Sequence, residues 1–109
     1  ENDMKKIYLF CSAGMSTSML AQEMQNVADA HGLPLEVKAY SHSKIGDIVE
    51  QLHPDCILLG PQVKYLYEET NRRFKETAPV AVIDASDYGM MNGERVLKTA
   101  IKLIKSFKK

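Results

Sequence analysis

Short apolar runs alternate with longer amphipathic segments along the whole chain. Four runs are rich in apolar residues, at positions 6–10, 35–40, 56–59 and 80–83. This alternation is typical of β-α-β units built around a parallel sheet. A continuous run such as Cys56-Ile57-Leu58-Leu59 suits a strand that is covered on both faces. The pattern therefore predicts an α/β fold with four parallel strands.

Helical spacing of apolar residues follows each predicted strand. We expect helices over 16–31 and 43–52, a third that begins at Pro61, and a fourth from about Gly93. Gly32 is the expected stop of the first helix. Right-handed crossovers then favour a doubly wound sheet with strand order 2-1-3-4 and helices on both faces. In such a sheet ligands bind beyond the carboxyl ends of strands one and three, at residues 11–18 and 60–62.

Cys11 stands where the first strand ends and a loop of small residues leads into the first helix. The unpartnered N–H groups of a first helical turn attract anions and favour the thiolate form of a cysteine. Phosphate is therefore the expected ligand, although capping of the helix by Ser16 or Thr17 and plain packing of Cys11 are equally open on these residues alone. The expected cradle consists of Ser12, Ala13, Gly14, Met15, Ser16, Thr17 and Ser18.

Composition is that of an ordinary globular protein. The 109 residues suffice for one domain, expected over 4–109, and 14 basic residues balance 14 acidic ones, so bulk charge favours neither nucleic acid nor a membrane surface. Two cysteines favour a reducing, cytoplasmic setting. The apolar run before Cys11 is shorter than the roughly 7 to 15 residues of a secretory signal. Residues 1–3 precede Met4 and are expected to be an expression remnant or a disordered end.

Several other chemistries lack their motifs. The chain has neither a Gly-x-x-x-x-Gly-Lys-Ser/Thr nor a Gly-x-Gly-x-x-Gly sequence, which disfavours nucleotide binding. Cys56 lies at the start of its predicted strand, too far from Cys11 for a disulfide, and is expected in the core. His31, His42 and His53 do not share one element at ligand spacing. We therefore expect no metal and no cofactor.

The informative comparison is with cysteine-dependent phosphatases, whose loop has an arginine six positions after the cysteine. Thr17 occupies that position here. Without an arginine to clamp the phosphoryl oxygens, sulfur can still accept a phosphoryl group, but hydrolysis has weaker assistance. A carrier is favoured. A low-molecular-weight cysteine phosphatase or arsenate-reductase-like enzyme, with Asp84 or Asp87 as general acid, stays open, as does a noncatalytic phosphate- or peptide-binding module.

Three segments together carry a family resemblance. They are Lys6-Ile7-Tyr8-Leu9-Phe10-Cys11-Ser12-Ala13-Gly14-Met15-Ser16-Thr17-Ser18, Leu58-Leu59-Gly60-Pro61-Gln62 and Val82-Ile83-Asp84. The chain resembles, from about Met4 to its last helix, the enzyme IIB component of the lactose/cellobiose (chitobiose) branch of the bacterial phosphoenolpyruvate-dependent sugar phosphotransferase system.

The resemblance implies a phosphorelay at the cysteine matching Cys11. A phosphohistidine of the IIA subunit would donate to this cysteine, and the phosphocysteine would pass the group to a β-linked disaccharide of the cellobiose, chitobiose or lactose class held by the membrane subunit IIC. Residues 12–18 would form the backbone cradle. Gln62 and Tyr88 would be rim contacts for phosphate or for IIA, with loop packing as the alternative for each. It further implies a cytoplasmic chain, transiently at the membrane through IIC; with this composition we expect a monomer. Met15 and Met19 would offer adaptable apolar contact to both partners.

Overall fold

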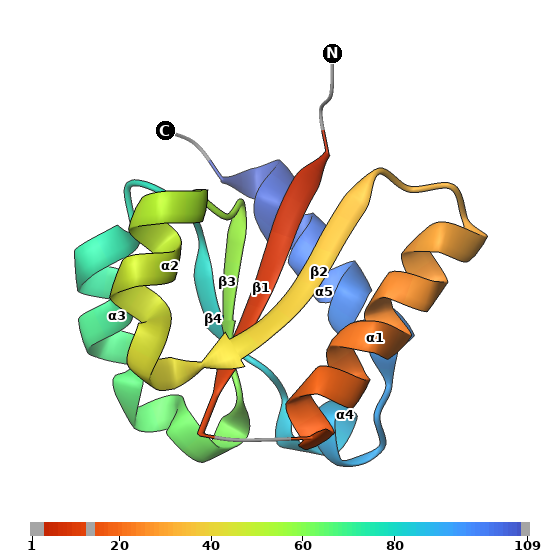
Figure 1. Cartoon of the computed structure of the whole chain (residues 1–109), viewed down its shortest axis with the longest axis horizontal. Helices are drawn as coiled ribbons and strands as arrows, with labels where there is room; N and C mark the ends of the chain where they lie inside the picture. The colour runs from red at the N-terminus through yellow and green to blue at the C-terminus, as the bar shows by residue number, and fades with distance from the viewer. Residues whose placement is uncertain (1–3, 13–14, 108–109) are drawn as a thin grey trace.

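Four parallel strands form one sheet in the order β2-β1-β3-β4 (Figure 1), as predicted. The structure is a computed structural model, and it describes residues 4–12 and 15–107. Cys11 is the last residue of the first strand, because its backbone pairs with Ser41, whereas the sequence placed it in the loop. The strands are β1 (Lys5–Cys11), β2 (Leu35–Ser41), β3 (Cys56–Leu59) and β4 (Val80–Val82).

All four predicted helical segments are present, and two of them begin as 3-10 turns. Gly32 ends the first helix with φ at +64°, and the next amide, of Leu33, donates to the Ala28 carbonyl at 2.8 Å. One short helix, α4, was not predicted. The elements are α1 (Met15–Ala30), η1 (His42–Lys44), α2 (Ile45–Leu52), η2 (Pro61–Leu66), α3 (Tyr67–Phe74), α4 (Ala85–Gly89) and α5 (Gly93–Ser106).

Strand β1 lies inside the sheet and serves two cores. Ile7 and Leu9 belong to the core under α1 and α5, whereas Tyr8 and Phe10 belong to the core under α2 and α3. Successive side chains of a strand point to opposite faces, so the unbroken apolar run follows from covering both faces. Figure 1 shows the two helix layers on either side of the sheet.

The parallel register brings the carboxyl ends of the strands to one edge. Phe10 pairs with Leu59 across β1 and β3, and Leu59 pairs with Val82 across β3 and β4. The segments that follow these strands, namely the start of α1, η2 and α4, therefore lie together at the bottom of Figure 1. This edge is where ligands bind in doubly wound sheets.

Edge strand β2 is partly capped by a side chain. The Gln25 amide, on α1, donates from Nε2 to the Leu35 carbonyl at 2.9 Å and accepts at Oε1 from the Val37 amide at 2.8 Å. These two bonds imitate one peptide of a neighbouring strand. They satisfy edge groups that would otherwise be open to pairing with another chain.

In the described ranges, 4–12 and 15–107, the longest helices fall short of the length and apolarity that crossing a membrane requires.

We expect Gln25→Ala to lower the free energy of unfolding by about 1–2 kcal/mol, because both bonds to the β2 backbone are lost. Gln22→Ala is the matched control, since Gln22, also on α1, bonds to the exposed Asn26 side chain, at 3.0 Å. Urea unfolding of the three proteins measures the difference. Equal stabilities for the two variants would contradict the role assigned to Gln25.

Candidate functional site

The Cys11 thiol lies at the carboxyl edge of β1, with only 2% of the residue exposed. It donates a hydrogen bond from Sγ to Oε1 of Gln62, on η2, at 3.0 Å. The Tyr88 hydroxyl, on α4, lies 3.8 Å from the same sulfur. Two elements distant in sequence from β1 therefore hold polar groups against this thiol. That Gln62 and Tyr88 also contact phosphate or IIA stays a prediction.

Thr17 completes the polar cluster from the first turn of α1. Its Oγ1 lies 2.9 Å from the Tyr88 hydroxyl, and both residues are buried. Either hydroxyl can be the donor, so Tyr88 can direct its own proton to Thr17 or toward the sulfur. Capping of the helix was one role open to Thr17 from the sequence, and in the structure its hydroxyl bonds across to α4.

Gly60 leaves the space that the thiol occupies. A Cβ added at Gly60 would stand 2.7 Å from the Cys11 sulfur and 3.2 Å from its Cβ, closer than side chains approach. The Gly60 amide also donates to the Phe10 carbonyl at 2.8 Å. The backbone at the junction of β3 and η2 is thus packed directly against Cys11.

The structure describes only some of the other predicted cradle residues. Ser12, Ser16 and Ser18 are exposed. Ala13 and Gly14 lie outside the described residues, as does the side chain of Met15. Their roles in the cradle stay predictions.

Cys56 differs from Cys11 in its position in the sheet and in its surroundings. It pairs in register with Ile7, at the other end of β1 from Cys11, is fully buried, and forms no disulfide. Burial, with a smaller contribution from Asp55, raises the pKa of the Cys56 thiol to about 12. Cys56 is therefore an inert core residue, as the sequence predicted.

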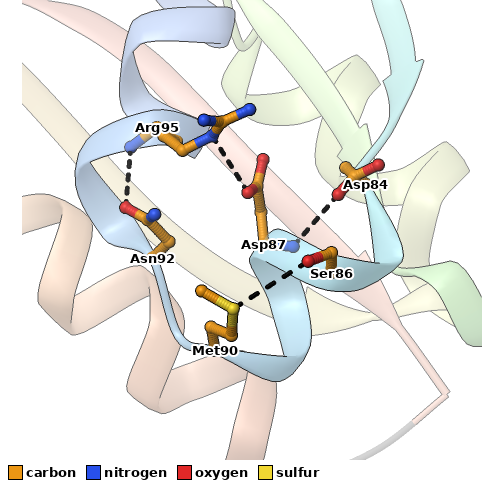
Figure 2. A network of polar contacts seen from close by, with 6 residues as sticks. All are labelled: Asp84, Ser86, Asp87, Met90, Asn92 and Arg95. Atoms are coloured by element: carbon orange, nitrogen blue, oxygen red, sulfur yellow. Dashed lines mark hydrogen bonds and ion pairs between the residues drawn. The ribbon is translucent and has the colours of Figure 1, made fainter.

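Both candidate acids of the phosphatase alternative have structural partners (Figure 2). Oδ2 of Asp84 accepts from the Asp87 amide at 3.1 Å and so caps α4. Oδ1 of Asp87 lies 3.1 Å from Nε of Arg95. These contacts give each carboxylate a structural role, so neither needs a role in proton transfer to explain its position.

His42 is a neighbour of Cys11 that sequence analysis did not identify. Its Nδ1 donates to the Cys11 carbonyl at 3.3 Å. The strand register could have indicated this contact, because Ser41 pairs with Cys11 and His42 follows Ser41 directly. Within residues 4–12 and 15–107, no three His, Cys, Asp or Glu side chains gather as a metal site.

The fold and site define a class of small doubly wound proteins with a thiol at the carboxyl edge of the central strand, and comparison with known proteins identifies the family. The family model described as PTS system, Lactose/Cellobiose specific IIB subunit matches residues 6–99. The chain belongs to this family, the lactose/cellobiose-specific IIB subunits of the sugar phosphotransferase system.

Relatives match nearly end to end. The galactose-specific EIIB component of Lactococcus lactis subsp. cremoris is 39% identical, covering 92% of this chain and 96% of its own. The cellobiose-specific EIIB component of Lactococcus lactis subsp. lactis matches equally well, at 39% identity over the same shares of both chains. The oligo-beta-mannoside-specific EIIB component of Bacillus subtilis is 35% identical, covering 93% and 97%.

Solved structures support the same assignment. The cellobiose-specific phosphotransferase IIB component protein from Borrelia burgdorferi has a TM-score of 0.78 and 32% identity, covering 97% of this chain and 96% of that one. The lactose-specific IIB component domain from Streptococcus pneumoniae has a TM-score of 0.79 at 15% identity, covering 93% and 98%, and shows the shared fold.

We expect Gly60→Ala to cost about 1–3 kcal/mol of stability and to change the rate at which iodoacetamide alkylates Cys11, because the new methyl group must displace the sulfur. Peptide mass spectrometry after timed alkylation measures the rate at each cysteine. Gly89→Ala is the control, since a Cβ there meets nothing within 4 Å. An unchanged Cys11 rate in Gly60→Ala would refute the close packing.

Proposed function

We propose that this chain carries phosphoryl groups on Cys11, receiving them from a phosphohistidine of a IIA protein and passing them to a sugar held by a membrane IIC protein. The reaction is that of a protein phosphohistidine–sugar phosphotransferase with a phosphocysteine intermediate. The observation that supports it is the contact of the Cys11 sulfur with uncharged polar side chains from two other elements. Membership of the family is consistent with it.

The chemistry balances in two in-line steps. In the first step, the Cys11 thiolate attacks phosphorus, the S–P bond forms, the P–N bond breaks, and the leaving imidazole takes up a proton. In the second, a sugar hydroxyl attacks phosphorus, the O–P bond forms, the S–P bond breaks, the hydroxyl proton passes to water, and the thiolate returns. Backbone N–H groups of residues 12–18 would hold the peripheral oxygens in both steps.

The side chains around the sulfur suit a cysteine that alternates between thiol, thiolate and phosphorylated forms. Gln62 accepts from the thiol as described, and a half-turn of its amide would present Nε2 as a donor to a thiolate or a phosphoryl oxygen. The Tyr88 and Thr17 hydroxyls can likewise reverse their donor roles. Neutral donors stabilise the phosphoryl group without the strong hold of a guanidinium, which favours release to the next acceptor.

Exposed apolar side chains on the elements that form the site would offer a surface for both partners. Each of three elements that supply a polar site residue also presents one: Met19 on α1, Tyr65 on η2 and Met90 directly after α4, with exposed fractions of 56%, 71% and 69%. Adaptable methionines and an aromatic ring suit a transient interface used by two partners in turn. Tyr65 and Met90 thus add to the contact expected for Met15 and Met19.

The hydrolytic alternative has less support. Thr17 stands in place of the phosphatase arginine, and its hydroxyl is engaged by Tyr88. Asp84 and Asp87, the two candidate general acids, are engaged as a helix cap and an ion pair. A carrier needs neither a general acid nor an arginine clamp.

The cellular setting follows from the partners. We expect the chain in the cytoplasm, as a monomer that visits the membrane through IIC. The sugar is set by the IIC chain rather than by this one, and the relatives carry galactose, cellobiose and oligo-beta-mannoside in their names at similar identity. A β-linked disaccharide is the class we propose.

Incubation with phosphoenolpyruvate, the two general phosphotransferase proteins and a cognate IIA tests the proposal. Peptide mass spectrometry is expected to find one phosphate, on Cys11, in the wild type and in Cys56→Ala, and none in Cys11→Ser. Phosphate on any other residue, or labelling that survives Cys11→Ser, would sink the carrier assignment. Rapid turnover of a phosphate ester by the isolated chain would favour the phosphatase instead.

A further inference from the structure

Helix α4 positions Tyr88 at the thiol, but it is too short to be stable as a helix without contacts to other elements. It spans only Ala85–Gly89. A helix forms with a costly first turn, and isolated helices below roughly 12–15 residues are marginal in water. The location of the Tyr88 hydroxyl must therefore depend on contacts that hold α4 from outside.

Figure 2 shows these contacts at the junction of α4 and α5. Asp84 caps the start of α4, and Arg95 reaches back from the first turn of α5 to Asp87, the residue directly before Tyr88. The Arg95 amide is itself held by Oδ1 of Asn92, at 3.1 Å. The Asn92 amide donates to the Asp87 carbonyl at 2.9 Å, so the turn is bonded on both its backbone and its side chain.

The start of α5 is in turn fixed against α1. A Cβ at Gly93 would stand 2.7 Å from Cγ of Glu23 and 3.0 Å from the Met24 amide nitrogen, so the two helices are in direct backbone contact. Helix α1 also carries Thr17, the partner of the Tyr88 hydroxyl. The contacts thus close a ring from α1 through α5 and α4 back to α1, and the Asp87–Arg95 ion pair is one of its links between α4 and α5.

We propose that Arg95 is a positioning residue for phosphoryl transfer: through Asp87 it holds α4 so that the Tyr88 hydroxyl stays at Thr17 and the Cys11 sulfur. The inference rests on the proposed function of Cys11. Arg95 is not a catalytic residue, because its side chain is 71% exposed and contacts Asp87 on the outer side of the turn. Asp87, at 13% exposure, is the shielded partner that transmits the constraint.

If the Arg95–Asp87 pair only stabilised the fold, removing another exposed ion pair of α5 would have the same effect on phosphoryl transfer. Lys98 and Glu94 form an ion pair on the same helix, at 3.4 Å and with similar exposure of the cation. Exposed pairs of this kind contribute little to stability. Lys98→Ala is therefore the matched control, since it removes a surface ion pair of α5 that does not reach α4.

The test measures the rate of phosphoryl transfer from a saturating phosphorylated IIA to Cys11 in a double-mutant cycle. We expect Arg95→Ala to slow transfer by about three- to tenfold in the wild-type background and to have no further effect in Tyr88→Phe, because coupled residues are not additive. Asp87→Asn is the second variant, and it is expected to give the same coupling. Lys98→Ala is expected to leave the rate unchanged.

Alkylation of Cys11 by iodoacetamide supplies a readout that does not depend on the relay. Arg95→Ala is expected to shift the Cys11 rate in the same direction as Tyr88→Phe, and only when Tyr88 is present. Equal slowing of transfer in both backgrounds, or rates in Arg95→Ala that match Lys98→Ala, would overturn the inference alone. If the wild type takes no phosphate on Cys11, the proposed function fails, and the alkylation cycle still decides the positioning role.

Discussion

The covering of β1 on both faces is the constraint on which the rest of the structure depends. Tyr8 and Phe10 pack into one core and Ile7 and Leu9 into the other, so the strand cannot shift by one residue without exchanging the two sets. Its neighbours β2 and β3 then fix where it ends. Cys11 is the residue at that end, and its place at the ligand-binding edge follows from the packing of apolar residues well away from it.

The polar surroundings of Cys11 are assembled from elements that meet only at this edge. Gln62 comes from the segment after β3, and Tyr88 from the helix after β4, where it meets Thr17 of α1. All three are uncharged and can act as donor or acceptor. Such a set can serve a thiol, a thiolate and a phosphothiol in turn, which is what a carrier requires and what a fixed guanidinium would oppose.

Much of this architecture could be predicted because the spacing of apolar residues along the chain indicates it. The four strands and the helices that follow them come from apolar spacing, the strand order comes from right-handed crossovers, and topology alone selected the loop at Cys11. Helix α4 could not be found this way, since five residues give no helical period and its shape depends on Asp84 and on Arg95 of another helix. The Thr17–Tyr88 bond and the His42 contact were hidden for the same reason: each joins elements whose approach only the packed fold determines.

The lifetime of the phosphoryl group on Cys11 tests the central claim most directly. Phosphorus-31 NMR can follow the phosphorylated chain alone and then with IIC-containing membranes and the transported sugar. We predict a phosphothiol signal that persists in the isolated chain and converts to sugar phosphate when acceptor is supplied. Prompt release of inorganic phosphate by the isolated chain would contradict it, because the neutral contacts of Gln62, Tyr88 and Thr17 would then be supporting hydrolysis rather than storage.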